Sequence, residues 1–400
     1  MKKTLLAAAL VAGFAGVAHA ESSVTLYGLV DAGYGYQNVQ TKYTGNQVNG
    51  KVSERKFGVQ NGVMNGNRWG LKGTEDLGNG TSAIFVLESG FDLGNGQLGQ
   101  YNKDDERERL FGRQAYVGLT GDSWGTFTIG RQYNAGDTFV APIDPFGTGG
   151  GLASATNIFG DSLSDRFDNV IKYVSPNFAG FQFGLGLVHG DKRQKVTGDR
   201  GEAKVTTRDL GVTTGLGYTN GPIYVGASFD YLNKKRTVDG VKNTSVNQRA
   251  WNIGGTYDFD VAKLHLLYGG QSGGAFGGLG LAASGLDYES SEFVDKNAVA
   301  ALDGRGLRQH SWLAGVSAPV GDAGKVMFSY AGNTIKNKQV NADLRAKSHN
   351  FALGYRHSLS KRTSVYGVAS YGWSNAKERQ ADTKIKTTAS QAIIGLQHRF

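Results

Sequence analysis

Hydrophobic and polar residues alternate along most of this 400-residue chain. In the segment 210–219, for example, Leu210, Val212 and Leu216 fall on one face, whereas small and polar residues fall on the other. The same pattern returns in 223–231. A period of two is typical of a β-strand with one apolar and one polar face. The pattern therefore predicts an all-β chain.

Sixteen segments of this kind are predicted, and the connections between them alternate between short and long. The segments are residues 23–37, 66–75, 80–92, 108–120, 124–132, 168–176, 180–190, 208–219, 222–233, 248–259, 262–272, 307–318, 324–335, 347–358, 363–374 and 389–400. The long connections lie near 38–65, 93–107, 133–167, 191–207, 234–247, 273–306, 336–346 and 375–388. Short turns at one end and long loops at the other are typical of an up-and-down barrel.

A soluble β-sandwich would also alternate, but three features favour a membrane barrel. Many of the strands are about ten residues long, the length that a tilted strand needs to cross a bilayer. Their polar faces are rich in Gly, Ser, Thr, Asp and Asn, which a water-filled lumen tolerates, and aromatic residues gather near the strand ends. Because both ends of the mature chain read as strands, pairing of the first with the last would close the sheet. We therefore predict an antiparallel transmembrane β-barrel of sixteen strands.

The connection at 133–167 differs from the others, because it is long and yet apolar. It carries apolar residues such as Phe139 and Ile143 together with acidic residues such as Asp137 and Asp144. Long loops without strand character are uncommon in compact domains and are usually functional or disordered. Since the apolar residues favour burial, we expect this loop to fold into the barrel and to narrow it.

The first twenty residues have the features of an export signal. Lys2 and Lys3 precede a short apolar run, and the small-x-small site Ala18-His19-Ala20 follows it. The expected organisation is a signal peptide at 1–20 and a barrel at 21–400, with the chain exported through the inner membrane. The apolar run is too short to cross a bilayer as a helix.

Composition agrees with a barrel and leaves the meaning of the charge open. The chain has 61 Gly, 5 Pro, no Cys, 18 Tyr and 20 Phe. Its formal net charge is +9, which is either a solubilising surface charge or a field that attracts anions. The basic residues are dispersed rather than gathered on one motif, so we expect no nucleic-acid partner.

Several motifs resemble those of the trimeric general porins of Gram-negative bacteria. The resemblance rests on Val24-Thr25-Leu26-Tyr27-Gly28, on the segments 68–78, 111–119 and 125–132, and on the C-terminal Phe400. It covers the whole mature length. It implies sixteen strands, a homotrimer in contact with outer-membrane lipids, and a third loop folded inward at the narrowest point of the pore.

Strand parity selects the residues that would line this constriction. Side chains opposite the outward-facing Trp69, Tyr116 and Ile171 point inward, and the family arrangement sets basic wall residues against an acidic third loop. The predicted constriction residues are Arg68, Lys72, Arg113, Lys172, Asp137 and Asp144. Arg131 has the opposite parity unless its strand kinks. Each loop Asp could instead cap the backbone of its own turn, each wall cation could be merely solvated, and lumen acids such as Glu88 could offset the arginines.

The resulting functional hypothesis is an outer-membrane porin, a water-filled channel for passive diffusion of small hydrophilic solutes and inorganic ions with a weak preference for anions. A substrate-specific channel with a dedicated solute site is the alternative. A barrel hydrolase would need a Ser/His constellation, for which His310-Ser311 is the nearest pair, and a barrel whose loops recognise a partner is a third possibility. The chain has no HExxH or P-loop motif, so we expect no enzyme activity, no cofactor and no metal site.

Overall fold

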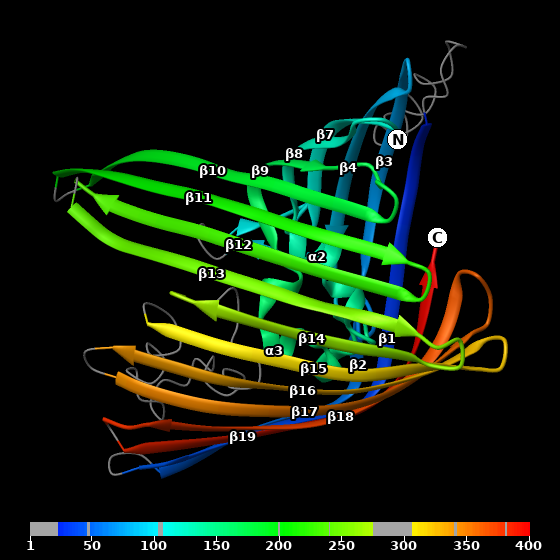
Figure 1. The fold of residues 1–400 in the computed structure, drawn as a ribbon. Helices are drawn as coiled ribbons and strands as arrows, with labels where there is room; N and C mark the ends of the chain where they lie inside the picture. Colours follow the sequence, from blue (N-terminus) through cyan, green and yellow to red (C-terminus); the bar gives the residue numbers. More distant parts are fainter. Residues whose placement is uncertain are drawn as a thin grey trace, which may run out of the picture.

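A computed structural model describes residues 23–45, 49–102, 107–198, 201–239, 241–274, 306–339, 342–380 and 382–400. The predicted signal peptide at 1–20 lies outside them. The described residues form an antiparallel sheet in which β1 pairs with β19, so that the sheet closes into a barrel (Figure 1). A separate small ladder joins β5 (Tyr101–Asn102) and β6 (Arg107–Glu108).

The barrel strands and their bounds are β1 (Ser23–Thr44), β2 (Asn49–Asn61), β3 (Arg68–Gly78), β4 (Thr81–Gly90), β7 (Gln114–Gly121), β8 (Gly125–Tyr133), β9 (Arg166–Val174), β10 (Phe181–Gly198), β11 (Gly201–Asn220), β12 (Ile223–Val238), β13 (Val241–Asp258), β14 (Lys263–Ser272), β15 (Leu307–Val320), β16 (Gly324–Gln339), β17 (Ala342–Ser358), β18 (Thr363–Glu378) and β19 (Thr383–Arg399).

β2 and β3 are two parts of one barrel strand, interrupted at residues 62–67. β3 pairs with the first part of β1, and β2 pairs with the second part. The buried Asp31 holds the interruption in place, since its carboxylate accepts hydrogen bonds from the backbone N–H groups of Val63 and Asn65 at 3.1 and 3.0 Å. With β2 and β3 counted as one, the described residues form sixteen barrel strands, which confirms the prediction.

At the end of the barrel that carries the long loops, the strands are longer than the hydrophobic pattern predicts. The predicted loops near 191–207, 234–247, 336–346 and 375–388 are largely strand, and β10 and β11 stay paired as far as Gly198 and Gly201. The loop prediction was wrong there. Beyond the bilayer both faces of a strand meet water, so the apolar alternation disappears although the backbone ladder continues. Most of the predicted loop at 273–306 lies outside the described residues.

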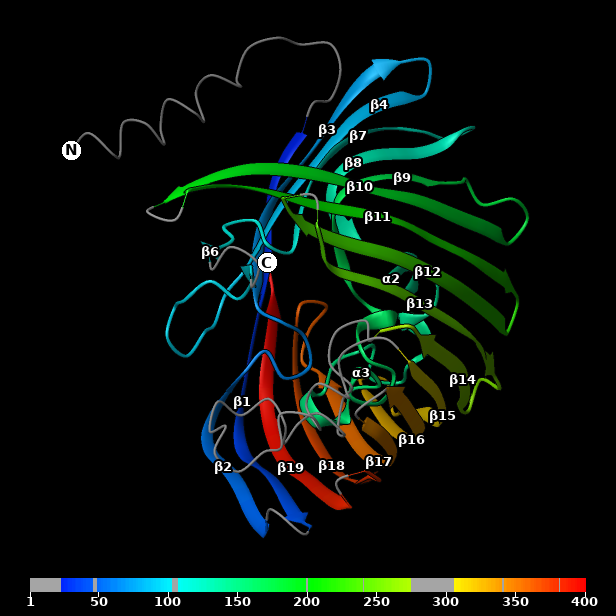
Figure 2. The same cartoon turned by 90° about the vertical axis from the view of Figure 1, so that its left-hand side faces the viewer.

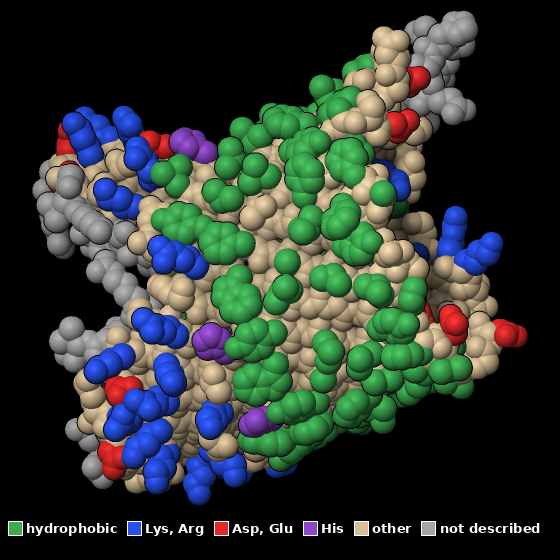
Figure 3. Space-filling model, in the orientation of Figure 1, with side chains coloured by type: hydrophobic (Ala, Val, Ile, Leu, Met, Phe, Trp, Pro, Cys, Tyr) green, Lys and Arg blue, Asp and Glu red, His purple; other side chains and the backbone are tan. Residues whose placement is uncertain are grey.

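Apolar side chains cover the outer surface of the barrel. Outward-facing residues such as Leu26, Val117, Phe328 and Ile394 are well exposed, and hydrophobic side chains extend across the middle of the strands in Figure 3. Such a surface would be unfavourable in water and is suited to lipid. Among the described residues, no helix has the length and apolar composition to span a membrane.

The third long loop lies inside the barrel. It is built from α2 (Ala135–Phe139), η1 (Ala141–Ile143), η2 (Gly151–Ala153), α3 (Thr156–Phe159) and η3 (Asp161–Leu163), and Figure 2 shows α2 and α3 within the ring of strands. Asn134 caps α2 by accepting a hydrogen bond from the backbone N–H of Asp137. Phe139 and Ile158 are fully buried in a cluster that includes Leu267 of the wall. The predicted inward fold of this loop is confirmed.

Wall side chains bind the inner loop from many sides. The bonds run from Asn134 Nδ2 to Asp230 on β12, from Ala135 N to Thr213 on β11, from His265 on β14 to the carbonyl oxygen of Ile143, from Asn333 on β16 to that of Ile158, from Asn350 on β17 to that of Leu152, and from Gln391 on β19 to that of Gly150, at 2.6–2.8 Å. Close approach also needs Gly226 on β12, because a Cβ there would lie 1.9 Å from the carbonyl oxygen of Phe139. The loop is therefore fixed to the wall around much of the circumference.

Candidate constriction of the pore

A polar cavity of about 660 Å³ separates the inner loop from the wall near β3 and β7. Its charged lining residues are Arg68, Arg113 and Arg166 on one hand and Asp137 on the other. Most of the remaining lining comes from residues 62–66 and from the loop. We refer to this space as the chamber. Three guanidinium groups against one carboxylate give its lining an excess of positive charge.

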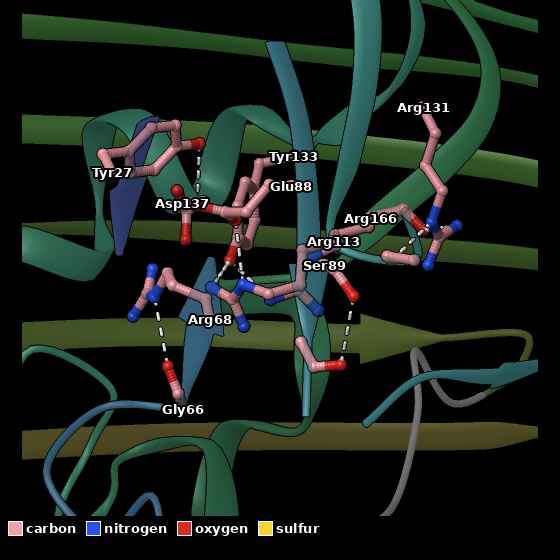
Figure 4. A network of polar contacts seen from close by, with 12 residues as sticks. Tyr27, Gly66, Arg68, Glu88, Ser89, Arg113, Arg131, Tyr133, Asp137 and Arg166 are labelled. Atoms are coloured by element: carbon pink, nitrogen blue, oxygen red, sulfur yellow. Dashed lines mark hydrogen bonds and ion pairs between the residues drawn. The ribbon is translucent and has the colours of Figure 1, made fainter. Parts of the chain in front are cut away.

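Arg113 is fixed by a buried ion pair. Its Nε lies 2.8 Å from Glu88 Oε1, and the exposed fractions of the two side chains are only 7% and 4%. The hydroxyl of Tyr27 donates to the other carboxylate oxygen of Glu88 at 3.1 Å, and Arg113 Nη2 donates to the hydroxyl of Tyr133 at 2.6 Å (Figure 4). Glu88 therefore largely offsets the charge of Arg113.

Arg68 contributes charge to the chamber without such compensation. It begins β3, and its Nε donates a 3.1 Å hydrogen bond to the carbonyl oxygen of Gly66 (Figure 4). Within the described residues it forms no ion pair with a carboxylate. A neutral carbonyl holds the guanidinium in position but leaves its charge uncancelled.

Tyr133, at the end of β8, connects two of the arginines. Its hydroxyl accepts hydrogen bonds from both Arg113 and Arg166. The guanidinium of Arg166 also lies over the Tyr133 ring, 4.3 Å from its centroid. One aromatic side chain thus positions two cations that would otherwise repel each other.

Asp137 is the acidic residue of the chamber lining. It lies in the first turn of α2 and accepts a 2.6 Å hydrogen bond from the Ser164 hydroxyl. Burial raises the pKa of Asp137, while the bond from Ser164 and the nearby cations Arg166, Lys172 and Arg113 act in the opposite direction. The loop therefore sets one partly buried carboxylate among the arginines.

Comparison with known proteins identifies the family. A family model described as Gram-negative porin matches residues 7–377. An outer membrane porin protein of Bordetella pertussis is 40% identical over 404 residues, which cover 100% of both chains. The chain belongs to the Gram-negative porin family. Its location is the outer membrane, and as a porin it is a passive channel rather than an enzyme.

Other relatives of this porin agree in length and fold. Outer membrane porin protein 32 of Delftia acidovorans is 31% identical over 92% of this chain and 88% of its own. The solved structure of an anion-selective porin from Comamonas acidovorans is 25% identical, with a TM-score of 0.60 over 95% of this chain and 100% of its own. The trimer form of OmpT from Vibrio cholerae, 15% identical with a TM-score of 0.54 over 95% and 99%, shares the fold. These relatives agree with the barrel fold of the porin.

Three of the predicted constriction residues do not line the chamber of the porin, and two of them are lysines. Lys72 is exposed further along β3, with its Nζ 5.5 Å from the centre of the Tyr27 ring. Lys172 is buried, and its Nζ donates to the carbonyl oxygen of Tyr133 at 3.0 Å and to Thr138 at 3.3 Å. Through these two bonds the ammonium group holds the start of the inner loop, between Tyr133 and Thr138, against the wall. For both lysines the predicted inward parity is compatible with the structure. Parity does not give the height of a side chain along the pore or the group that the side chain contacts.

Asp144 is the third residue and needs a similar correction. Its carboxylate is buried and accepts hydrogen bonds from the backbone N–H groups of Phe146, Thr148 and Ala155 at 3.0–3.2 Å. Burial raises the pKa of Asp144 to about 6 although these three donors lower it. Of the two roles considered for the loop acids, the structure gives Asp144 the capping role within the loop.

Arg131 lies apart from the chamber at a kink in its strand. The register of β8 against β9 shifts between Gly130 and Gln132. Arg131 Nη1 lies 2.6 Å from Asp168, which Arg109 also binds.

Tyr133 lines the chamber but is not among the predicted constriction residues. The alternation along β8 indicates this residue only when the register shift between Gly130 and Gln132 is known. Among the described residues, no group of three or more His, Cys, Asp or Glu side chains is arranged to hold a metal ion.

Proposed function

We propose that this outer-membrane porin, a channel for passive diffusion of small hydrophilic solutes and inorganic ions, favours anions weakly at the chamber. The observation that carries the proposal is Arg68, whose positive charge is not paired with a described carboxylate. An anion passing this side chain gains Coulomb energy, and a cation loses it. The anion-selective porin from Comamonas acidovorans, which shares the fold and 25% of the residues, supports the same sign.

The chamber is small enough for its charges to act on each passing ion. Arg68, Arg113 and Arg166 face one carboxylate across a space of about 660 Å³. With Glu88 offsetting Arg113, the excess is close to one positive charge, so the preference is weak. A substrate-specific channel remains the alternative hypothesis. It would require a row of side chains that binds one solute, and the chamber lining within the described residues has Tyr133 as its aromatic residue.

The test is the reversal potential of the purified porin in a planar bilayer under a KCl gradient. A large ohmic conductance with a reversal potential of the sign for chloride is expected. A reversal potential of the sign for potassium would refute the anion preference but keep the channel. Saturation of the current by one solute at low concentration would favour the substrate-specific alternative.

We further propose that the functional unit is a homotrimer of residues 21–400, which forms after removal of the signal peptide at 1–20. Native mass spectrometry of the protein extracted from the outer membrane tests both points, because it gives the number of subunits and the mass of each. A monomer, or an N-terminus other than Glu21, would contradict them.

A further inference from the structure

A row of basic side chains crosses the outer face of the barrel in register. Lys336 on β16 lies directly opposite Arg345 on β17, Arg345 opposite Lys377 on β18, and Lys377 opposite Lys384 on β19. Toward its other neighbouring strand, β15, Lys336 lies opposite Arg308. All five belong to the outward face of their strands, since their neighbours along the chain point into the barrel. Five adjacent strands thus present a cation at the same height.

A second row lies two residues closer to the membrane. It contains Lys347, Asn375, Lys386 and Lys42, which are paired in this order across β17, β18, β19 and β1. Between the two rows runs a groove of about 850 Å³. Each of β16–β19 contributes two outward-facing residues to its lining, with one inward-facing residue between them. The groove therefore opens outward and not into the lumen. We refer to it as the basic groove.

Such a row is unfavourable without an anionic partner. Like charges directly opposite each other destabilise a sheet. Among the described residues, carboxylates meet two of the cations: Asp343 lies 3.6 Å from Arg345, and Asp382 lies 2.9 Å from Lys377. Lys347, Lys384 and Lys386 form no ion pair with a described residue. The basic groove accordingly has the charge to bind a molecule with more than one negative group.

The basic groove lies at the height of lipid headgroups. Directly below it on the same strands is an aromatic cluster of Tyr330, His349, Phe351, Tyr371 and Trp373. Trp373 is two residues from Asn375 along β18, which is a step of about 7 Å. Aromatic belts mark the boundary between hydrocarbon and headgroups. In Figure 3 the basic side chains gather at the lower-left ends of these strands, next to the hydrophobic band.

A second groove on the same strands lies within the hydrophobic band. Its volume is about 520 Å³, and its lining is mainly apolar, with the small residues Gly367, Ala369 and Ala392 between Leu353 and Ile394. Small side chains between large ones leave a channel in which an acyl chain can lie. The same strands therefore carry a polyanion groove above and an apolar groove below, with the aromatic cluster between them.

We propose that this face binds a phosphorylated glycolipid of the outer leaflet, with its phosphate groups in the basic groove and an acyl chain in the apolar groove. The charge excess selects for phosphate groups, and the arrangement of the two grooves along the same strands selects for an amphiphile rather than a soluble anion. Clusters of Lys and Arg beside a membrane surface attract anionic lipids in this way.

The experiment measures binding of diphosphorylated lipid A to the full-length detergent-solubilised porin by native mass spectrometry. The variant is the triple substitution Lys347→Gln, Lys384→Gln and Lys386→Gln. Since each cation near an anionic lipid contributes about fivefold in affinity, binding is expected to weaken by at least about tenfold. Lipid A without its phosphates should bind no more tightly to the wild type than to the variant. Gly367→Leu, whose Cβ would have Ile394 as its nearest neighbour at 4.0 Å, places a larger side chain in the apolar groove and should weaken lipid A binding without changing charge.

The matched control removes the same charge elsewhere. Lys234→Gln, Lys235→Gln and Arg236→Gln lie at the loop end of β12, outside both grooves, and are expected to change affinity by less than about twofold. Equal weakening in the two triple variants would overturn the site, because it would show attraction by net charge alone. Unweakened binding in the groove variant would also overturn it, as would a change of oligomeric state in that variant, which would make the face a subunit interface. An unchanged thermal unfolding temperature shows that each variant is folded.

Discussion

Replacement of Arg68 by Gln tests the charge of the chamber with little disturbance of the fold. The side chain is held by one hydrogen bond to the carbonyl oxygen of Gly66. Gln can occupy similar space and can still donate a hydrogen bond. The substitution removes one positive charge from a lining of three arginines and one aspartate. The expected result is a loss of anion preference with nearly unchanged conductance and stability.

The magnitude follows from Coulomb's law. For an ion that passes about 7 Å from the guanidinium in water, the interaction is about 0.6 kcal/mol, favourable for an anion and unfavourable for a cation. The difference of about 1.2 kcal/mol corresponds to a change of about sevenfold in the anion-to-cation permeability ratio. Screening at 0.1 M salt, where the Debye length is about 10 Å, reduces this change to about threefold. The reversal potential under a KCl gradient measures the ratio directly.

Lys72→Gln is the matched control, because it removes the same charge from the same strand outside the chamber lining. Its reversal potential should stay close to that of the wild type. If Arg68→Gln and Lys72→Gln shift the reversal potential equally, the channel responds to total charge and not to the chamber. If Arg68→Gln shifts nothing even at low salt, where screening is weakest, the charges that select ions lie elsewhere.

Three further predictions concern the partners of these charges. Glu88→Gln should leave Arg113 buried without its carboxylate, so anion preference should rise while stability falls by about 3–5 kcal/mol, measured by reversal potential and thermal unfolding; an unchanged unfolding temperature would contradict the ion pair. Because the pKa of Asp137 is raised, this carboxylate should take up its proton at a higher pH than an ordinary Asp, so anion preference should increase as the pH falls through mild acid. Asp137→Asn should remove that pH dependence, and its persistence would assign the titration to another group. Asp144→Asn should set an amide N–H against a backbone N–H, at a cost of about 1–3 kcal/mol, and should make the single-channel current noisier; a quiet current would show that the loop does not depend on this carboxylate.

The alternation of side chains was sufficient to predict the barrel but not its full height. Within the bilayer each strand has one face in lipid and one in the lumen, so period two is visible in the sequence. Outside the bilayer, as in the segment from Lys192 to Lys195, both faces meet water and the period disappears, although β10 remains paired with β11. The split of the second strand into β2 and β3 depends on Asp31, whose contacts with Val63 and Asn65 are not local in sequence.

The residues that line the chamber could be predicted only in part. Parity predicts that Arg68 and Arg113 face the interior, and both lie in the chamber lining together with Asp137. Parity carries no information about which carboxylate meets which cation across the barrel. The capping role of Asp144 and the role of Tyr133 as a bridge both depend on the path of the inner loop, which no periodic pattern specifies.

The attachment of the inner loop to the wall constrains how the channel can form and how it can close. Hydrogen bonds from β11 to β19 hold this loop, and Gln391 on β19 binds it beside the seam with β1. A loop bonded to the last strand cannot reach its final position before that strand arrives, so packing of the interior depends on the same strand that completes the seam. Nor can such a loop swing away as a lid, because many bonds would have to break together. The many bonds thus favour control of flow by the side chains around a fixed opening over control by movement of the inner loop.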